Sequence, residues 1–147
     1  MTTAYAVEPA TTDDLDSLVD LWVDLVESQR AFGAHIESEA NRTAARDILA
    51  QYVAGDRVAI ATPVPDPAGP DVSRPVLGFV MYYLEDGVYD MDTSRGLVEN
   101  VYVAPDVRDQ GIGTQLMEYA EATLADRGAS VIALSVMAAN QRGRSFY

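Results

Sequence analysis

The 147-residue sequence predicts a mixed α/β fold, a twisted sheet flanked by helices with the element order β-α-α-β-β-β-α-β-α. Apolar residues make up 48% of the chain, enough to bury one sizeable core, so we expect a single domain over residues 1–147. The clearest pattern is a strand–loop–helix–strand run in the C-terminal half. Such a run predicts two parallel strands joined by a right-handed crossover.

Hydrophobic periodicity places two helices in the N-terminal half, after a short strand at residues 5–7. The first helix has apolar residues at helical spacing from residue 15 to residue 26, with Trp22 among its core positions. The second is expected to run from about Ser38 to Tyr52 and to end at Gly55.

Runs of β-branched and aromatic residues predict the remaining strands, and proline marks the longest loop between them. Residues 63–75 contain five prolines, which excludes a helix or a central strand and indicates a long hairpin loop. Residues 87–96 are a second polar connection. The strands are expected at residues 57–62, 76–84, 97–103 and 131–136, and the later helices at residues 111–127 and 140–147.

The charged residues and the missing cysteine narrow the function classes. Acids outnumber bases 23 to 10, and a net charge of −13 argues against a nucleic-acid partner, because phosphate binding needs a basic surface. The absence of cysteine excludes disulfides, thiolate catalysis and Cys-ligated metals, and no metal site is expected. The sequence shows no secretion signal and no apolar run long enough for a membrane span, so a cytoplasmic protein is expected.

Every one of the ten basic residues is arginine, and there is no lysine. This composition resembles that of halophilic proteins from salt-loving archaea. A strongly acidic surface repels itself at low ionic strength and is screened to within about 3 Å in 1 M salt. A GC-rich genome that favours arginine codons is the alternative explanation.

Two glycines stand where the strand at residues 97–103 gives way to a helix, in the sequence Arg108-Asp109-Gln110-Gly111-Ile112-Gly113. Glycines there let backbone N–H groups approach a ligand, and the helix N-terminus and the arginine favour an anion. A phosphate or pyrophosphate is therefore the expected ligand, with a plain turn as the alternative. A P-loop is excluded because it requires a lysine, and a dinucleotide site fits poorly because Leu116 replaces its third glycine.

These residues resemble the signature of the GNAT superfamily of N-acetyltransferases, R/Q-x-x-G-x-G/A, which reads here as Arg108, Gly111 and Gly113. The resemblance spans the whole chain, although the family's last two strands have no counterpart in it; they would follow this sequence or come from a partner, or the site would be incomplete. The elements before and after the signature in that family are matched by Val101–Pro105, Leu134–Val136, Asn140 and Phe146–Tyr147.

The resemblance implies that acetyl-CoA is the acetyl donor. The main chain of Val101, Tyr102 and Val103 would hold its acetyl carbonyl and pantetheine arm, and Asn140 would contact that arm. Asp109 departs from the family pattern and is expected to face solvent, because an acid beside a pyrophosphate is unfavourable. The backbone N–H groups that would bind the pyrophosphate are those of Arg108, Asp109, Gln110, Gly111, Ile112, Gly113 and Thr114.

Acetyl transfer to an amine requires a proton acceptor, because an alkylamine with a pKa near 10.4 is protonated at pH 7. Glu99 is the best candidate for this base. Alternation along its strand places it on one face with Val101 and Val103. Its alternative role is an ion pair with Arg95 or Arg108.

The remaining candidates also have structural alternatives. By resemblance, Tyr147 would act as the acid that protonates the departing sulfur, or it would pack in the core. Asn140 could instead cap the last helix, and His35 lies in a loop that shapes the acceptor pocket in relatives, or else on the surface. An acceptor pocket could be lined by Tyr82, Tyr83 and Tyr89, with one of the first two facing the core.

We therefore expect an acetyl-CoA-dependent N-acetyltransferase that moves an acetyl group directly to a primary amine with base and acid assistance. A non-catalytic acyl-CoA-binding sensor is the alternative. The acceptor stays open between an amine-bearing small molecule and a protein or peptide amine, and a homodimer stays open as well.

The charge of −13 predicts that stability rises with salt over the molar range. Added KCl screens the repulsion among the acidic groups, so the melting temperature should increase between about 0.1 and 3 M KCl. A melting temperature that stays flat or falls over this range would favour the genome-composition explanation.

Overall fold

The computed structural model describes residues 5–30, 39–64, 75–85 and 94–134, which contain a five-stranded sheet in the order β1-β2-β3-β4-β5. Neighbouring strands are antiparallel except for β4 and β5, which are parallel. This mixed sheet confirms the predicted fold class. The strands are β1 (Tyr5–Pro9), β2 (Val58–Pro63), β3 (Gly78–Leu84), β4 (Arg95–Val103) and β5 (Val131–Leu134).

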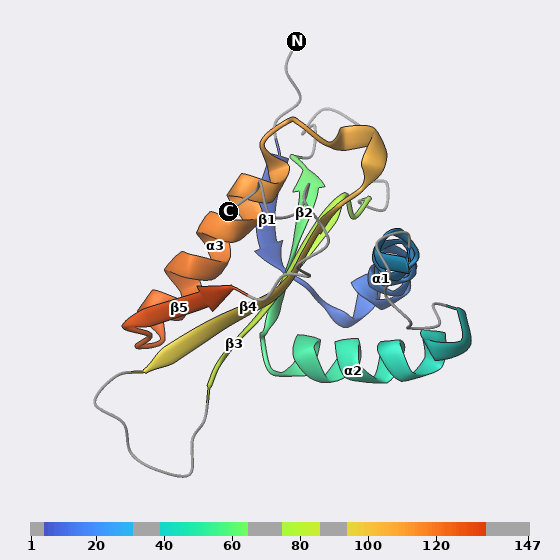
Figure 1. The fold of residues 1–147 in the computed structure, drawn as a ribbon. Coiled ribbons are helices and arrows are strands. Elements are labelled where there is room, and N and C mark those ends of the chain that lie inside the picture. The colour runs from blue at the N-terminus through green and yellow to red at the C-terminus, as the bar shows by residue number, and fades with distance from the viewer. Residues whose placement is uncertain (1–4, 31–38, 65–74, 86–93, 135–147) are drawn as a thin grey trace.

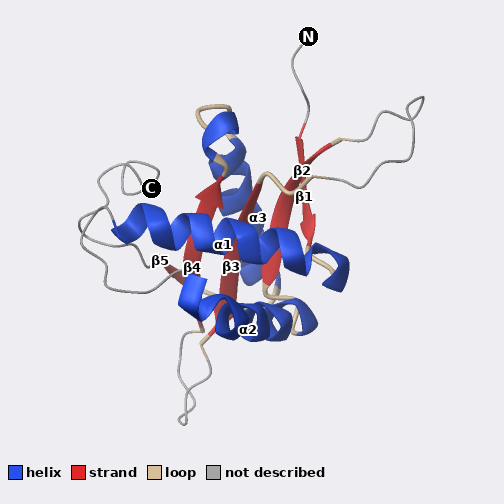
Figure 2. Cartoon of the chain, turned by 90° about the vertical axis from the view of Figure 1, so that its right-hand side faces the viewer, coloured by secondary structure: helices blue, strands red, loops and turns tan. Residues whose placement is uncertain are grey.

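Helices cover both faces of the sheet (Figure 1). Helices α1 (Leu15–Arg30) and α2 (Arg42–Ala54) lie on one face, and α3 (Ile112–Asp126), which connects β4 to β5, lies on the other. Figure 2 looks onto the first face, where α1 and α2 lie in front of the strands. None of the helices in the described segments is long and apolar enough to cross a membrane.

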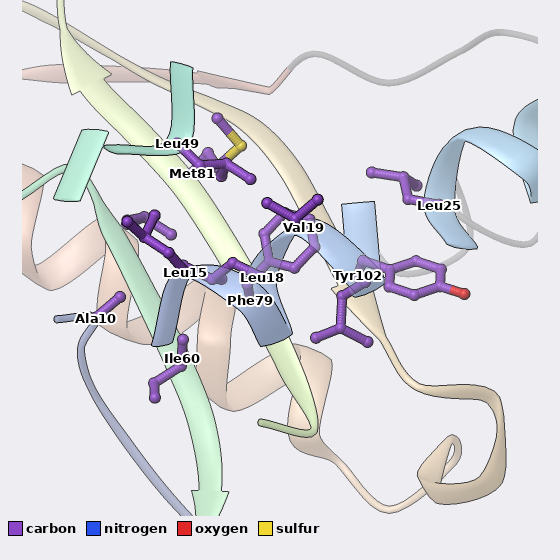
Figure 3. Packing of buried hydrophobic residues seen from close by; sticks show 12 residues of the cluster. Ala10, Leu15, Leu18, Val19, Leu25, Leu49, Ile60, Phe79, Met81 and Tyr102 are labelled. Carbon is purple, nitrogen blue, oxygen red and sulfur yellow. The ribbon is translucent and has the colours of Figure 1, made fainter. Parts of the chain in front are cut away.

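The sheet separates two hydrophobic clusters. On the α1–α2 face, Leu18 and Leu49 pack against Ile60, Phe79 and Met81 of the strands (Figure 3). On the α3 face, alternate residues of the same strands pack against the apolar side of α3, and this second cluster includes Ala59, Ala61, Val80, Tyr82, Val98, Val103, Ile112, Leu116, Met117, Ala120 and Leu124. Period-two alternation thus assigns the core residues of β2 and β3 to one or the other of the two layers.

Two expected strand ends and one helix start differ from the structure. The strand expected at residues 76–84 begins at Gly78, and α2 begins at Arg42, after a 3₁₀ turn at Glu39–Asn41, rather than at Ser38. The loop expected at residues 87–96 ends two residues early: Arg95 pairs with Val131 and its carbonyl oxygen accepts a hydrogen bond from the Glu85 N–H (2.8 Å). Backbone pairing therefore extends β4 beyond the apolar run that predicted it.

The proline-rich loop was also placed one residue too early. Pro63 is the last residue of β2 and pairs with Tyr5 of β1, and a proline is tolerated at the end of a strand. The rest of the predicted loop, the end of the last strand at residues 135–136 and the helix expected at residues 140–147 lie largely or wholly outside the described residues.

Gly78 allows the start of β3 to approach the end of β4. It pairs with Val103, and a Cβ atom on it would lie 2.7 Å from the carbonyl oxygen of Tyr102 and 3.2 Å from Cδ1 of Leu116 in α3. The absent side chain thus lets the end of β4 and the first turns of α3, which carry the candidate site, pack together.

We expect Gly78→Ala to lower the free energy of unfolding by about 1–3 kcal/mol, because the atom it would displace belongs to the backbone. Gly55→Ala is the matched control: its Cβ would meet only the Arg57 side chain, at 2.7 Å from Nε, and that side chain can turn away. Urea unfolding of both variants measures the difference, and equal losses would contradict the packing role of Gly78.

Candidate active site

Strand β4 pairs with β3 on one edge and with β5 on the other. Its parallel pairing with β5 is described from Arg95 opposite Val131 to Val98 opposite Leu134, the last described residue of β5. On the other edge, the N–H of Ala104 donates to the carbonyl oxygen of Leu77 (2.8 Å). In an antiparallel ladder this bond directs the N–H and C=O groups of Val101 and Val103 away from β3, towards the side of β5.

A β-bulge interrupts β4 at Glu99. Met81 of β3 pairs with Asn100, but the next residue, Tyr82, pairs with Val98, so Glu99 is an extra residue without a partner in the register. A bulge of this kind leaves one residue unpaired and interrupts the alternation of side chains.

The bulge makes the predicted orientation of Glu99 wrong. Val101 and Val103 pack in the α3 cluster, whereas the Glu99 carboxylate accepts a hydrogen bond from the phenol of Tyr52 in α2, on the opposite face of the sheet. Asn100 lies on that same face, with Nδ2 3.5 Å from the sulfur of Met81. Glu99 therefore lies at the bulge of β4, with its carboxylate on the α2 face.

The alternative role of Glu99, an ion pair with Arg95 or Arg108, is not found among the described residues. Arg95 pairs instead with Glu85, at 3.6 Å between Nη1 and Oε2. Arg108 donates from Nε to the carbonyl oxygen of Val103 (2.9 Å), and its guanidinium carbon lies 5.1 Å from the ring centroid of Tyr102. Among the described residues, Tyr52 is thus the hydrogen-bond partner of Glu99.

The loop between β4 and α3 has the backbone geometry expected of an anion site. Gly111 caps α3 with a φ of 81°, and beyond its own helical turn a Cβ on it would have no described heavy atom within 4 Å. Asp109 also has a positive φ, 66°, and its side chain is exposed, as predicted. This free space at a helix N-terminus fits a phosphate group approaching the backbone N–H groups.

A pocket of about 220 Å³ opens between α1 and α2 on the face that carries Glu99. Trp22 is only half-buried, because it lines this pocket as well as packing on the core. The expectation for the tyrosine pair is confirmed: Tyr82 is fully buried, whereas Tyr83 is half-buried. The other residues lining the pocket are Asn41, Ala44, Ala45, Ile48, Leu49 and Met81.

Four predicted site residues lie outside the described residues, namely His35, Tyr89, Asn140 and Tyr147. Among the residues that are described, no group of acidic or histidine side chains could hold a metal ion. The structure therefore places Glu99 on the α2 face of β4 and joins the end of β4 to the loop before α3 through Arg108.

Comparison with known proteins identifies what this arrangement is. The sequence model of the acetyltransferase (GNAT) family matches residues 28–147. The chain belongs to the GNAT acetyltransferase family. Sequence motif and fold agree, because the matched region includes β4, the glycine loop and α3.

Curated relatives of the GNAT chain include thialysine N-epsilon-acetyltransferases. The Sus scrofa protein is 32% identical over 89 residues, which cover 60% of this chain and 50% of that protein. The Bos taurus protein is 31% identical over 83 residues, 56% of this chain and 45% of that protein. The chain thus spans about half the length of these curated relatives.

Solved structures share the fold over nearly the whole chain. A GCN5-related N-acetyltransferase from Ralstonia eutropha JMP134 superposes with a TM-score of 0.69 at 21% identity, covering 97% of this chain and 90% of that one. The PaiA N-acetyltransferase from Thermoplasma acidophilum, in complex with coenzyme A, has a TM-score of 0.72 at 18% identity, covering 98% and 86%. At these identities the likeness shows the fold.

Sequence reasoning missed Tyr52. Its position in α2 was predicted only as the end of a helix, and nothing in the local pattern links it to Glu99, 47 residues later. The available signal was that a tyrosine with a polar tip on a core-facing helix needs a hydrogen-bond partner when it is partly buried.

Proposed function

We propose that this chain is an acetyl-CoA-dependent N-acetyltransferase that moves an acetyl group directly to a primary amine. The observation that carries the proposal is the bulge in β4: the Glu99 carboxylate lies on the α2 face, while the peptide groups of Val101 and Val103 point away from β3, next to the loop that leads into α3. The acetyl donor, the anion site and the base are proposed to meet at this end of β4.

In this proposal, backbone groups form the binding site for acetyl-CoA, the acetyl donor. The N–H groups from Arg108 to Thr114 would hold the pyrophosphate of acetyl-CoA, where the dipole of α3 adds positive charge. The main chain from Val101 to Val103 would bind the pantetheine arm and polarise the acetyl carbonyl, because hydrogen-bond donors stabilise the oxyanion that forms there. Asn140 is proposed as a further contact to the arm.

Glu99 is proposed as the proton acceptor. Glu99 removes a proton from the ammonium form of the amine, directly or through water, and the neutral nitrogen then attacks the carbonyl carbon of the thioester. The nitrogen of the adduct loses its second proton to solvent. The carbon–sulfur bond then breaks, and Tyr147 gives its phenol proton to the departing thiolate. The products are an N-acetylated amine and coenzyme A.

The acceptor is proposed to approach from the α1–α2 face. The carboxylate of Glu99 lies there, and the half-buried Tyr83 and the pocket beside Trp22 are on the same side of the sheet. A primary amine is favoured as the acceptor group, because it is the group that thialysine acetyltransferases modify and because a protein of charge −13 attracts cations. A small molecule and a protein or peptide amine both present this group.

A thiol-release assay over a panel of primary amines tests the proposal. The chain should release free thiol from acetyl-CoA only when an accepted amine is present, and the assay should be run in high KCl. Acetyl-CoA that binds and raises the melting temperature without any thiol release would indicate a sensor instead of an enzyme.

We expect Gly111→Val to abolish acetyl-CoA binding, because its side chain would fill the space through which the pyrophosphate approaches. Gly128→Val is the matched control: Gly128 also has a positive φ, 104°, and open space around it, but lies at the other end of α3. Both variants should lose stability, and titration calorimetry should show binding lost in the first alone. Full affinity in Gly111→Val would mean that the loop is only a turn.

We expect Glu99→Gln to reduce turnover about 10²–10⁴-fold near neutral pH, with little change in acetyl-CoA affinity. Glutamine keeps the shape of the side chain and still accepts the hydrogen bond from Tyr52, but it cannot take up the proton. The loss should shrink as the pH approaches the pKa of the amine. Wild-type turnover at pH 7 with saturating amine would show that the base is elsewhere.

A further inference from the structure

We propose that Tyr52 is a positioning residue for Glu99. Its phenol O–H donates a hydrogen bond to Oε1 of the carboxylate and thereby directs Oε2 towards the amine. The inference rests on the proposed function and adds to it a residue of α2 that matches no part of the acetyltransferase motif. The hydrogen bond joins the end of α2 to the bulge of β4.

The bulge is the reason that Glu99 needs such a contact. Its backbone has no partner in the β3–β4 register, so the ladder does not fix the direction of its side chain. A glutamate side chain with three rotatable bonds has several rotamers available at such a position. The bond from Tyr52 selects one in which the carboxylate lies against α2.

The Tyr52 ring is itself held in place. The N–H of Arg57 donates to the backbone carbonyl oxygen of Tyr52 (2.8 Å), and the guanidinium carbon of Arg57 lies 5.6 Å from the ring centroid. Arg57 can reach back over this turn because Gly55 has no side chain; a Cβ there would lie 2.7 Å from Nε of the arginine. Tyr52 is thus a hydrogen-bond donor whose ring is held in place by Arg57.

Tyr52 remains a donor over the working pH range. Burial, followed by the hydrogen bond and charge of Glu99 and the nearby Tyr83, raises the pKa of the Tyr52 phenol above its usual value, while Arg57 acts in the opposite direction. The groups that face the pair from the described elements are therefore Tyr83 of β3 and Arg57 after α2. Arg95 of β4 is engaged with Glu85.

One oxygen of Glu99 is committed to this bond, and Oε2 has no hydrogen-bond partner among the described residues. Removing the donor at Oε1 should let the Glu99 side chain change rotamer, which moves the carboxylate away from the amine.

The test compares kcat and KM of Tyr52→Phe with those of the wild type, measured by thiol release with one amine for all variants. We expect kcat to fall about tenfold, since a hydrogen bond to a charged group is lost and the carboxylate is no longer held in position. KM for the amine and acetyl-CoA affinity should be unchanged. Tyr119→Phe is the matched control, because it removes a phenol from α3 on the other face and should leave kcat unchanged.

A double variant separates positioning from a general loss of structure. In a Glu99→Gln background, Tyr52→Phe should change the residual rate less than about twofold, because the group it acts through is absent. A wild-type kcat in a folded Tyr52→Phe overturns the inference, as does an equal rate loss in both backgrounds. Tyr52→Leu replaces the phenylalanine variant if melting shows that the latter is unfolded.

The outcome also distinguishes this inference from the proposed function. Wild-type protein that releases no thiol with any amine overturns both. If the wild type is active and Glu99→Gln is slow, but Tyr52→Phe has wild-type kinetics, Glu99 remains the base and only the role of Tyr52 is overturned.

Discussion

The bulge in β4 is the constraint on which the site depends. Met81 of β3 pairs with Asn100 and Tyr82 pairs with Val98, so Glu99 is an extra residue, and its carboxylate lies on the α2 face. Beyond the bulge, the N–H and C=O groups of Val101 and Val103 point away from β3. Buried backbone groups require partners, and Arg108 supplies one by bonding the carbonyl oxygen of Val103. One inserted residue therefore decides on which face of the sheet the carboxylate lies, relative to the end of β4 that Arg108 joins to the loop before α3.

Much of this arrangement was predictable, because its signals are local. Apolar periodicity predicts α1 and α3, and the glycine at residue 111 with the arginine three positions before it predicts an anion site at a helix start. The structure adds the positive φ of Gly111 and the space in front of it. Each of these features depends on residues within one or two turns of chain, which is the range that sequence patterns cover.

The direction of Glu99 was not predictable, because a single extra residue reverses it. Strict alternation assigns it to the face of Val101, and only the pairing of β4 with β3 shows where the count shifts. A bulge leaves no mark in the hydrophobic pattern when the inserted residue is polar and lies at a layer boundary. Its bond to Tyr52 is equally invisible to local patterns, since it joins residues 47 positions apart.

Arg108 shows a related limit, because its charge predicts attraction for phosphate but not which of its donors is already engaged. Its Nε bond to Val103 and its position over Tyr102 make it a brace between the end of β4 and the loop that precedes α3. Any attraction it exerts on an anion therefore comes from a guanidinium fixed to the end of β4, so the glycine loop and the end of β4 are coupled through one side chain.

Added salt weakens the exposed ion pairs of the surface but not the buried contacts that hold the site in place. Arg42 bonds Asp20 at 2.8 Å across α1 and α2, but both side chains are substantially exposed, and such pairs contribute little and weaken further as salt is added. The packing of Leu18 and Leu49 on the sheet is not screened, and the Tyr52–Glu99 bond is partly buried and a direct contact. A chain of this acidity can therefore lose its surface ion pairs at high ionic strength and still keep α2, and with it the carboxylate of Glu99, in place at the bulge of β4.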